Sequence, residues 1–267
     1  MSKKQTNLAA ASGPKVNYAT PALEKGLDVI ELLAHQSGGL TKSQLARELN
    51  RTVSEIFRML LCLERRGYIA QVSEDRYSLT LKMFKLVQEH PPTERLIADA
   101  LPVMQRLAHD TSQSCHLGVL EAGRVVILAQ VSPPTSIGFY VKVGSTVDIM
   151  DAASGYVMLA HQDASHRALT LEEWARTTGH QPPADLDMHL KRIRKAGFER
   201  RASYQVKGVM NVSYPILDDR GNPLAALTVP YIEYNHPRVP MAEVTEITGR
   251  AASEITAAIG GVPAKPL

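Results

Sequence analysis

Cysteine is scarce in this sequence, which contains only Cys62 and Cys115 among its 267 residues. Two cysteines are too few for a disulfide framework, and each is expected to be a small buried apolar residue. No apolar run approaches the roughly 18 to 20 residues that cross a bilayer. Residues 1–19 lack a sustained apolar segment and are predicted to be a disordered polar tail, not a signal peptide. These absences favour a cytoplasmic protein with no membrane partner.

Sequence motifs of common enzymes are also missing: there is no G-x-S-x-G, Walker A, G-x-G-x-x-G or H-E-x-x-H. His161, Asp163 and His166 form a compact trio that a metal could use, but exposed loop residues are the favoured interpretation of their spacing. Cys115 and His116 could suggest a thiol–imidazole pair, yet neighbours on a strand point to opposite faces. The sequence therefore predicts no enzyme, no cofactor and no metal site.

Charge is nearly balanced overall, with a formal net charge of +3, but it is unevenly distributed. Residues 1–90 carry 13 Lys and Arg and 9 Asp and Glu, whereas the remainder carries 17 and 18. A basic excess in the first third is expected where phosphate neutralisation drives association with nucleic acid. A solvated basic face would give the same count.

The basic third contains two predicted helices with N-terminal caps. Thr41 with Gln44, and Thr52 with Glu55, both fit the capping box. Apolar spacing predicts that the first helix buries Leu45 and Leu49, and that the second buries Ile56, Met59, Leu60 and Leu63 before Gly67 ends it. Strand-like runs at 68–72 and 76–79 flank a polar turn and predict a hairpin beside the second helix. This order of elements is that of a winged helix-turn-helix.

The exposed face of the second helix predicts contact with a DNA major groove. Arg58 is the candidate for a base or phosphate contact, although a merely solvated arginine would also fit. The other candidates are Thr52 and Ser54 for polar contacts, Lys42, Arg51 and Arg76 for phosphates, and Phe57 for a thymine methyl or for packing.

Helices are predicted on both sides of this motif. A scaffold helix begins at Thr20-Pro21, with Leu23, Leu27, Ile30 and Leu33 along one side. After the hairpin, a linker helix is expected from residue 81 until Pro91-Pro92 stops it. We therefore predict a DNA-binding domain over 20–80 and a linker over 81–92.

The remaining residues, 93–261, change repeatedly between helical and strand-like periods. Helices are predicted at 94–111, near 155–160, at 169–177, at 186–197 and at 244–259, and strands at 116–120, 124–131, 137–143, 198–206, 209–217 and 223–232. Strands with helices distributed among them predict one mainly antiparallel sheet flanked by helices, hence an α+β domain.

The whole pattern resembles the IclR family of bacterial transcriptional regulators. The matching segments are LTKSQLARELNRTVSEIFRMLLCLERRGYI, HLGVLEAGRVVILAQV, IRKAGFERR and PILDDRGNPLAALTV, in an order that covers residues 20–261. The resemblance implies an all-α winged helix-turn-helix, a linker helix and a GAF-like α+β effector domain. It also implies a homodimer or dimer of dimers that represses or activates an operon in response to a small organic acid.

The family pattern places the effector pocket against the central sheet. Carried onto this chain, it implies effector contacts from Ala153, Ser154, Arg201, Asn211, Thr228 and Pro230. Arg201, Asn211, Thr228 and Pro230 depart from the residues frequent there. An Arg201 facing the pocket would bind a carboxylate and favour an anionic effector, whereas Arg200 and Arg201 could instead continue the basic surface run of 191–195. Tyr140, Tyr156, Tyr204 and Tyr214 could line the pocket or pack on the sheet.

Two other classes of function remain open from the sequence. The α+β domain could be an enzyme or a metabolite sensor whose winged helix mediates protein contacts, or the chain could be a constitutive DNA-binding dimer without an effector. Salt-dependent DNA affinity that a metabolite changes would separate a ligand-responsive repressor from both.

Overall fold

The protein divides into two compact units, Met1–His90 and Pro91–Leu267. The computed structural model describes residues 20–73, 75–88, 91–235 and 238–264. The predicted tail at 1–19, Glu74 of the predicted turn and residues 89–90 of the predicted linker lie outside these residues. Among the residues described, no helix is both long enough and apolar enough to span a bilayer.

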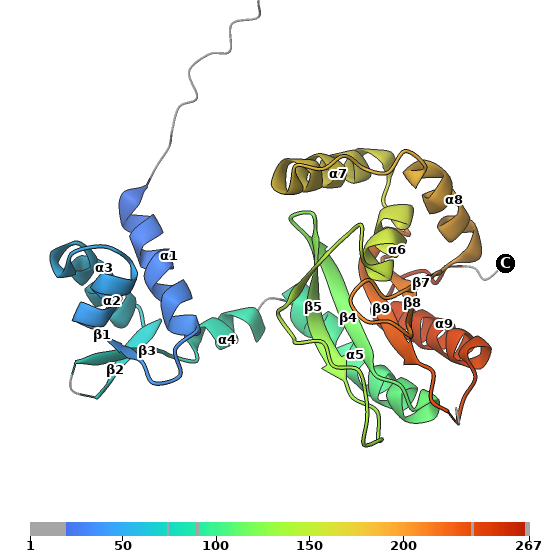
Figure 1. Ribbon diagram of the computed structural model, residues 1–267, viewed down its shortest axis with the longest axis horizontal. Coiled ribbons are helices and arrows are strands. Elements are labelled where there is room, and N and C mark those ends of the chain that lie inside the picture. The colour runs from blue at the N-terminus through green and yellow to red at the C-terminus, as the bar shows by residue number, and fades with distance from the viewer. Residues whose placement is uncertain (1–19, 74, 89–90, 236–237, 265–267) are drawn as a thin grey trace, which may run out of the picture. The chain divides into compact units, whose positions relative to one another are not determined.

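The N-terminal unit is mainly helical, with a three-stranded sheet in the order β1-β3-β2 (Figure 1). Its core contains buried side chains from all three of the first helices and from each strand. The elements, in chain order, are α1 (Pro21–Ala34), β1 (Leu40–Thr41), α2 (Lys42–Glu48), α3 (Val53–Arg65), β2 (Ile69–Ser73), β3 (Arg76–Leu79) and α4 (Lys82–Gln88). The predicted hairpin is β2 and β3, and the sequence did not predict β1, which adds a third strand.

The ends of α2 and α3 follow from their sequences. Both predicted capping boxes form, with Thr41 bonded reciprocally to Gln44 and Thr52 to Glu55. After α3, the Gly67 amide donates to Glu64 and the Tyr68 amide to Leu63, with Gly67 at a φ of +74°. This pair of bonds is a Schellman motif, whose left-handed residue is most often glycine.

The predicted buried face of α1 is wrong at its first two positions. Leu23 and Leu27 are 60% and 48% exposed, whereas the predicted Leu33 is buried in the core together with Val29, which was not predicted. The helix contains two overlapping apolar stripes, and spacing along one helix does not decide which of them the neighbouring helices cover.

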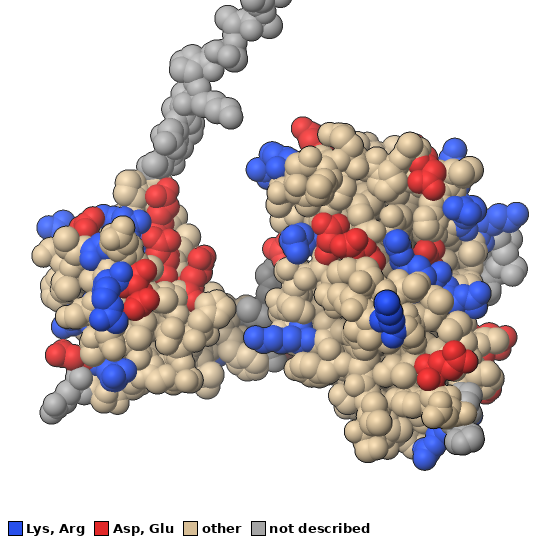
Figure 2. Space-filling model, viewed as in Figure 1, with Lys and Arg blue, Asp and Glu red and all other residues tan. Residues whose placement is uncertain are grey.

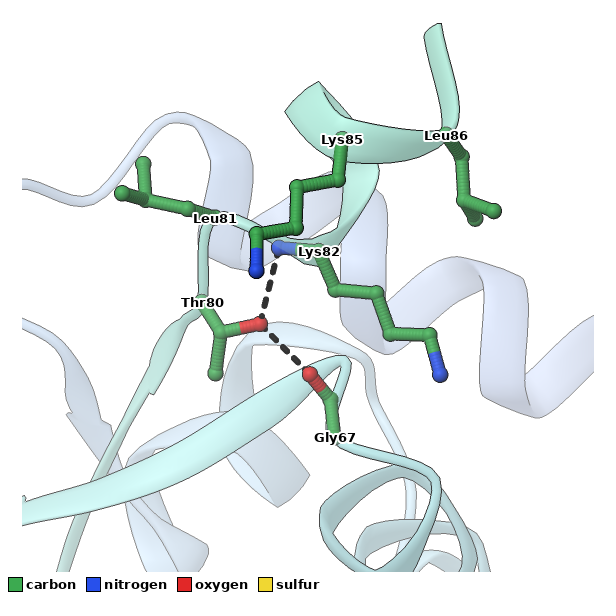
Figure 3. A pocket seen from close by; sticks show the side chains of 6 residues that line it. All are labelled: Gly67, Thr80, Leu81, Lys82, Lys85 and Leu86. Atoms are coloured by element: carbon green, nitrogen blue, oxygen red, sulfur yellow. Dashed lines mark hydrogen bonds between the residues drawn. The ribbon is translucent and has the colours of Figure 1, made fainter. Parts of the chain in front are cut away.

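The base of the wing is tied to α4 through one hydroxyl group. Thr80 Oγ1 donates to the Gly67 carbonyl at 2.5 Å and accepts from the Lys82 amide at 3.1 Å, which caps the start of α4 (Figure 3). A cavity of about 420 Å³ lies here, lined by these residues together with Leu81, Lys85 and Leu86. Because α4 is bonded to the wing here, the first turn of the linker belongs to the N-terminal unit.

The C-terminal unit is an α+β domain built on a six-stranded sheet in the order β6-β5-β4-β9-β8-β7, with every neighbouring pair antiparallel. Its elements, in chain order, are α5 (Pro91–Thr111), β4 (Cys115–Glu121), β5 (Arg124–Val131), β6 (Thr146–Asp148), α6 (Ala153–His161), α7 (Ala164–Thr178), α8 (Leu186–Ala196), β7 (Glu199–Ala202), β8 (Val209–Leu217), β9 (Pro223–Ile232) and α9 (Met241–Ala258).

The two faces of this sheet are covered by different helices (Figure 1). One core contains side chains of α5 and α9 against β4 and β9, including Leu117 and Leu227. The other contains side chains of α6, α7 and α8, including Tyr156 and Trp174. Cys115 belongs to the α5 and α9 side, where burial raises the pKa of its thiol to about 12. Cys115 therefore points to the opposite face of the sheet from its neighbour His116, which lines a small cavity beneath α6, as strand alternation predicts.

Three predicted elements of this unit differ from the structure. The expected strand at 137–143 is irregular, because the Gln130 side chain supplies the bonds that a strand partner would make. Its amide donates to the Phe139 carbonyl at 3.3 Å and accepts from the Val141 amide at 3.4 Å. In addition, Pro91 begins α5, so the proline pair starts a helix, and β7 spans only four of the nine residues predicted.

Candidate functional site

The outer face of α3 is exposed as its periodicity predicts. Ser54, Arg58 and Arg65 are exposed, and Phe57 and Leu61 are 42% and 48% exposed. The opposite face buries Ile56 and Leu60 in the core. Within the described chain, the Arg58 guanidinium has no ion-pair partner, so its charge is open to an anion from outside.

The other predicted phosphate contacts already have partners within the unit. Arg51 forms an ion pair with Asp28 at 3.2 Å, and Arg76 donates to the Gly39 carbonyl at 3.0 Å. The Lys42 ammonium lies 5.7 Å from the centre of the Phe57 ring. These three cations are thus held in place by intramolecular contacts, and each remains partly exposed.

Thr52 and Glu55 form one capping unit at the start of α3. Hydrogen bonds from the Thr52 backbone amide and hydroxyl, followed by one from Lys25, lower the pKa of the Glu55 carboxyl to about 2. The Glu55 carboxylate therefore accepts three hydrogen bonds as a helix cap, and it is not a free carboxylate on the exposed face of α3.

In the view of Figure 2, acidic side chains gather over α1, whereas basic and acidic side chains are interspersed over the part that contains α2 and α3. The exposed Arg58 and Arg65 nevertheless place positive charge on the outer face of the predicted reading helix.

A small cavity in the C-terminal unit brings together four of the six predicted effector contacts. Ala153 and Ser154 approach it from the start of α6, Asn211 from β8 and Thr228 from β9. Its volume is about 50 Å³, and the remaining lining residues are His116, Phe139, Val141, Val147, Ala152, Ser203, Tyr204 and Gln205. We call this the α6 cavity.

The donors available in the α6 cavity are neutral. The N-terminal cap of α6, Ala152, makes no side-chain hydrogen bond, so the first amides of the helix lack a side-chain acceptor. Such amides, together with the helix dipole, favour a bound anion. His116 is 8% exposed, and burial lowers the pKa of its imidazole to about 4, so this ring is uncharged near pH 7.

Arg201 and Pro230 are beside the α6 cavity but do not line it. Arg201 is half-buried, with its guanidinium carbon 4.3 Å from the centre of the Tyr156 ring and a hydrogen bond of 3.4 Å to the Met150 carbonyl. On the sheet, both Arg201 and Pro230 are paired with Asn211, from opposite sides. Arg201 is thus neither a cavity-lining group nor a freely solvated surface residue.

Other candidate groups are dispersed. Of the four tyrosines, only Tyr204 lines the α6 cavity. Tyr156 packs under Arg201, Tyr214 stacks on Phe198 with ring centres 5.1 Å apart, and Tyr140 is 69% exposed.

The side chains of His161, Asp163 and His166 do not point to one common site. His161 bonds to the Val157 carbonyl, whereas His166 bonds to Asp163 at the cap of α7. Sequence reasoning missed His116 as a lining residue, because its position opposite Thr228 comes from a strand pairing that the sequence does not show.

Comparison with protein families matches both units. Residues 93–257 match the model described as the bacterial transcriptional regulator IclR C-terminal domain, and residues 22–73 match the IclR helix-turn-helix domain. The chain belongs to the IclR family. It is thus a transcriptional regulator with a DNA-binding domain and an effector domain, as the resemblance implied.

Individual IclR-family relatives match over most of their length. The HTH-type transcriptional regulator KdgR of Dickeya chrysanthemi is 26% identical, over 86% of this chain and 77% of its own. The acetate operon repressor of Salmonella typhimurium is 23% identical, over 97% of both. A crystal structure of an IclR homolog complexed with 4-hydroxybenzoate from Microbacterium hydrocarbonoxydans has the same fold, with a TM-score of 0.71 and 20% identity over 89% of this chain and 98% of that one.

Proposed function

We propose that this protein is a repressor whose affinity for an operator is changed by a small anionic metabolite. Residues 20–80 would bind DNA, residues 93–261 would bind the metabolite, and residues 81–92 would connect them. The observation that carries the proposal is the α6 cavity, where predicted effector contacts from three separate elements meet at an uncapped helix start. The repressor role is supported by the name of the Salmonella relative.

An organic acid is the effector class that the cavity favours. A carboxylate placed at Ala153 and Ser154 could accept from the free amides of α6 and from the serine hydroxyl. Asn211 and Thr228 could bind its polar end, and the nearby Arg201 would add a positive potential without direct contact. The relative crystallised with 4-hydroxybenzoate, itself a carboxylate, supports the same class.

DNA binding would use the exposed face of α3 together with Thr52, Ser54, Phe57 and Arg58. Lys42, Arg51 and Arg76 are placed around it as candidates for backbone phosphates, which position a protein on the duplex without reading its sequence. Each of the three would add to affinity by neutralising phosphate charge.

We further propose a homodimer, or a dimer of dimers, as the active form. Exposed apolar side chains support it: Leu23 and Leu27 on α1, and Met83, Phe84 and Leu86 on α4. Apolar groups at this density on a surface favour burial against a partner, here a second copy of the chain. Two copies would meet two half-sites whose spacing is set by the dimer.

The decisive experiment is fluorescence anisotropy of the purified protein with the DNA upstream of its own gene and with an unrelated fragment, at several salt concentrations. We expect selective binding that weakens steeply with salt. Organic acids added to the same sample should then change the affinity for the upstream fragment only. Turnover of a metabolite without DNA binding would favour the enzyme alternative, and DNA binding that no metabolite changes would favour a constitutive dimer.

A further inference from the structure

A second cavity of the C-terminal unit lies on the face of the sheet that α9 covers. Its volume is about 520 Å³, and it is formed where the turn between α8 and β7 meets β8 and one side of α9. Tyr214, which lines it, is paired with Leu227 of the α5 and α9 core, and directly paired residues project to the same face of a sheet. Thr228 of the α6 cavity projects to the other face. We call the second cavity the α9 pocket.

Two stacked aromatic rings form one wall of the α9 pocket. The ring centres of Phe198 and Tyr214 lie 5.1 Å apart, at an interplanar angle of 20°. Both side chains are only half-buried, so this wall offers an apolar surface on which a further flat ring can stack. Burial, followed by the charge of Glu246, raises the pKa of Tyr214 to about 12. The phenol is therefore an uncharged hydrogen-bond donor near pH 7.

A glycine in α9 brings this aromatic wall close to the helix. Gly249 lies inside α9, where glycine is about 1 kcal/mol less favourable than alanine. A Cβ at this position would lie 3.0 Å from two carbon atoms of the Tyr214 ring, so a larger residue would displace the ring. Gly249 thus lets the ring lie directly against the helix, which gives the pocket its aromatic wall.

The α9 side of the pocket carries one acidic and one basic side chain. Glu246 and Arg250 both line the pocket and are both exposed. They are one helical turn apart, a spacing that brings two side chains together on one helix face and commonly gives an ion pair. Within the part of the chain that the structure describes, however, neither side chain belongs to an ion pair. Both charges are therefore available to a molecule in the pocket.

These groups together fit one class of small molecule. An α-amino acid carries an ammonium group and a carboxylate on one carbon atom, so the two charges can face Glu246 and Arg250 at the same time. The guanidinium can bind the carboxylate through two N–H groups. A volume of about 520 Å³ is within the roughly 300–1,000 Å³ of small-molecule pockets.

We propose that the α9 pocket binds an aromatic α-amino acid, with its carboxylate on Arg250, its ammonium group on Glu246 and its ring on the aromatic wall. The protein would then have a second small-molecule site, on the face of the sheet opposite to the α6 cavity. This inference goes beyond the proposed function and does not depend on it, because none of the residues involved lines the α6 cavity or belongs to the DNA-binding unit.

The test is isothermal titration of the full-length protein, without DNA, at pH 7.5 with L-phenylalanine and L-tryptophan. For the tighter of the two, we compare the analogue without the ammonium group, 3-phenylpropionate or indole-3-propionate, and the analogue without the carboxylate, phenethylamine or tryptamine. Each analogue should bind at least about 10-fold more weakly than the amino acid, which is about 1.4 kcal/mol. L-Alanine, which lacks the ring, should not bind measurably.

Two variants at exposed positions assign the contacts. Arg250→Gln should weaken binding of the amino acid about 10-fold and leave the analogue without the carboxylate unchanged. Glu246→Gln should weaken the amino acid similarly and leave the analogue without the ammonium group unchanged. Arg192→Gln on α8 is the matched charge control, and Asn211→Ala alters the α6 cavity. Both of these controls should retain full affinity for the amino acid.

No binding of either amino acid, analogues that bind as tightly as the amino acid, or unchanged affinity in Arg250→Gln and Glu246→Gln would overturn the inference. Loss of binding in folded Asn211→Ala protein would place the amino acid in the α6 cavity and would overturn it as well. A failure of the proposed function is a separate result, because it is seen as missing operator selectivity or as operator affinity that no organic acid changes.

Discussion

Arg58 is the one residue on which the proposed DNA contact most depends, because it is exposed on α3 and has no intramolecular ion pair among the described residues. We expect Arg58→Ala to weaken operator binding by about 1–3 kcal/mol, or roughly 5- to 150-fold, with an unchanged unfolding midpoint. Anisotropy measures the affinity and urea unfolding the stability. Arg192→Ala, an exposed arginine on α8, is the matched control and should bind normally. An Arg58→Ala variant with full affinity would remove this residue from the interface.

Buried histidine makes a second prediction at the residue scale. The pKa of His116 is lowered from 6.5 to about 4 on folding, so between these values the unfolded chain binds a proton that the folded chain does not. Stability should therefore fall as the pH decreases from 6.5 towards 4, with a slope of up to about 1.4 kcal/mol per pH unit from this group. His116→Asn should show a shallower loss in urea unfolding across this window. His109→Asn, which alters an exposed ring, should retain the full slope. Equal slopes in all three proteins would contradict the assignment.

The sequence predicted some residues of the candidate effector site and missed others. Ala153, Ser154, Asn211 and Thr228 were placed by family resemblance, and they do meet at one cavity. The sequence left open whether Arg201 faces the pocket or continues the basic surface run. In the structure the Tyr156 ring and a backbone carbonyl hold its side chain, and neither contact has a signature in sequence spacing. His116 was considered only as a partner of Cys115, because its place in the cavity follows from strand pairing with Thr228 that sequence spacing does not show.

At the scale of elements, capping residues and apolar periods predicted most helices and strands. Thr41 and Thr52 mark helix starts because their hydroxyl groups bond locally, and local bonds are visible in a sequence. The segment 137–143 was mistaken for a strand because its alternation is that of a strand, whereas its bonds come from the distant Gln130 side chain. Strand pairing depends on such non-local partners, which no window of residues contains.

The packing of α6 gives a prediction at this scale. A Cβ added to Gly155 would overlap the backbone of Ile149, whereas one added to Gly26 of α1 would meet no atom within 4 Å. Gly155→Ala should therefore destabilise the C-terminal unit by about 1–3 kcal/mol through overpacking. Gly26→Ala should stabilise α1 by up to about 1 kcal/mol, because alanine has the higher helix propensity. Urea unfolding measures the change in the free energy of unfolding for both variants. If Gly155→Ala stabilised the protein as Gly26→Ala is expected to, this account of the packing of α6 would be refuted.

At the scale of the whole molecule, the two units can influence each other only through a difference in free energy. A coupling of about 1–3 kcal/mol would change operator affinity roughly 5- to 150-fold when the effector binds. By linkage, operator DNA must change effector affinity by the same factor. Titrating the effector into the protein with and without operator DNA, and DNA with and without effector, checks this equality. Two unequal factors would mean that a further species, such as a change of oligomer, takes part.

The order of the C-terminal sheet also bears on how the chain folds during synthesis. Its central strands are β4 and β9, which lie near opposite ends of the unit in sequence, so the sheet cannot close until β9 has left the ribosome. The widest strand pairing of the N-terminal unit joins Leu40 to Tyr77, which is a much shorter separation, so this unit can fold first. A nascent chain would then carry a folded DNA-binding unit while the effector unit is still exposed, and truncated translation products would carry it without any means of response to a metabolite.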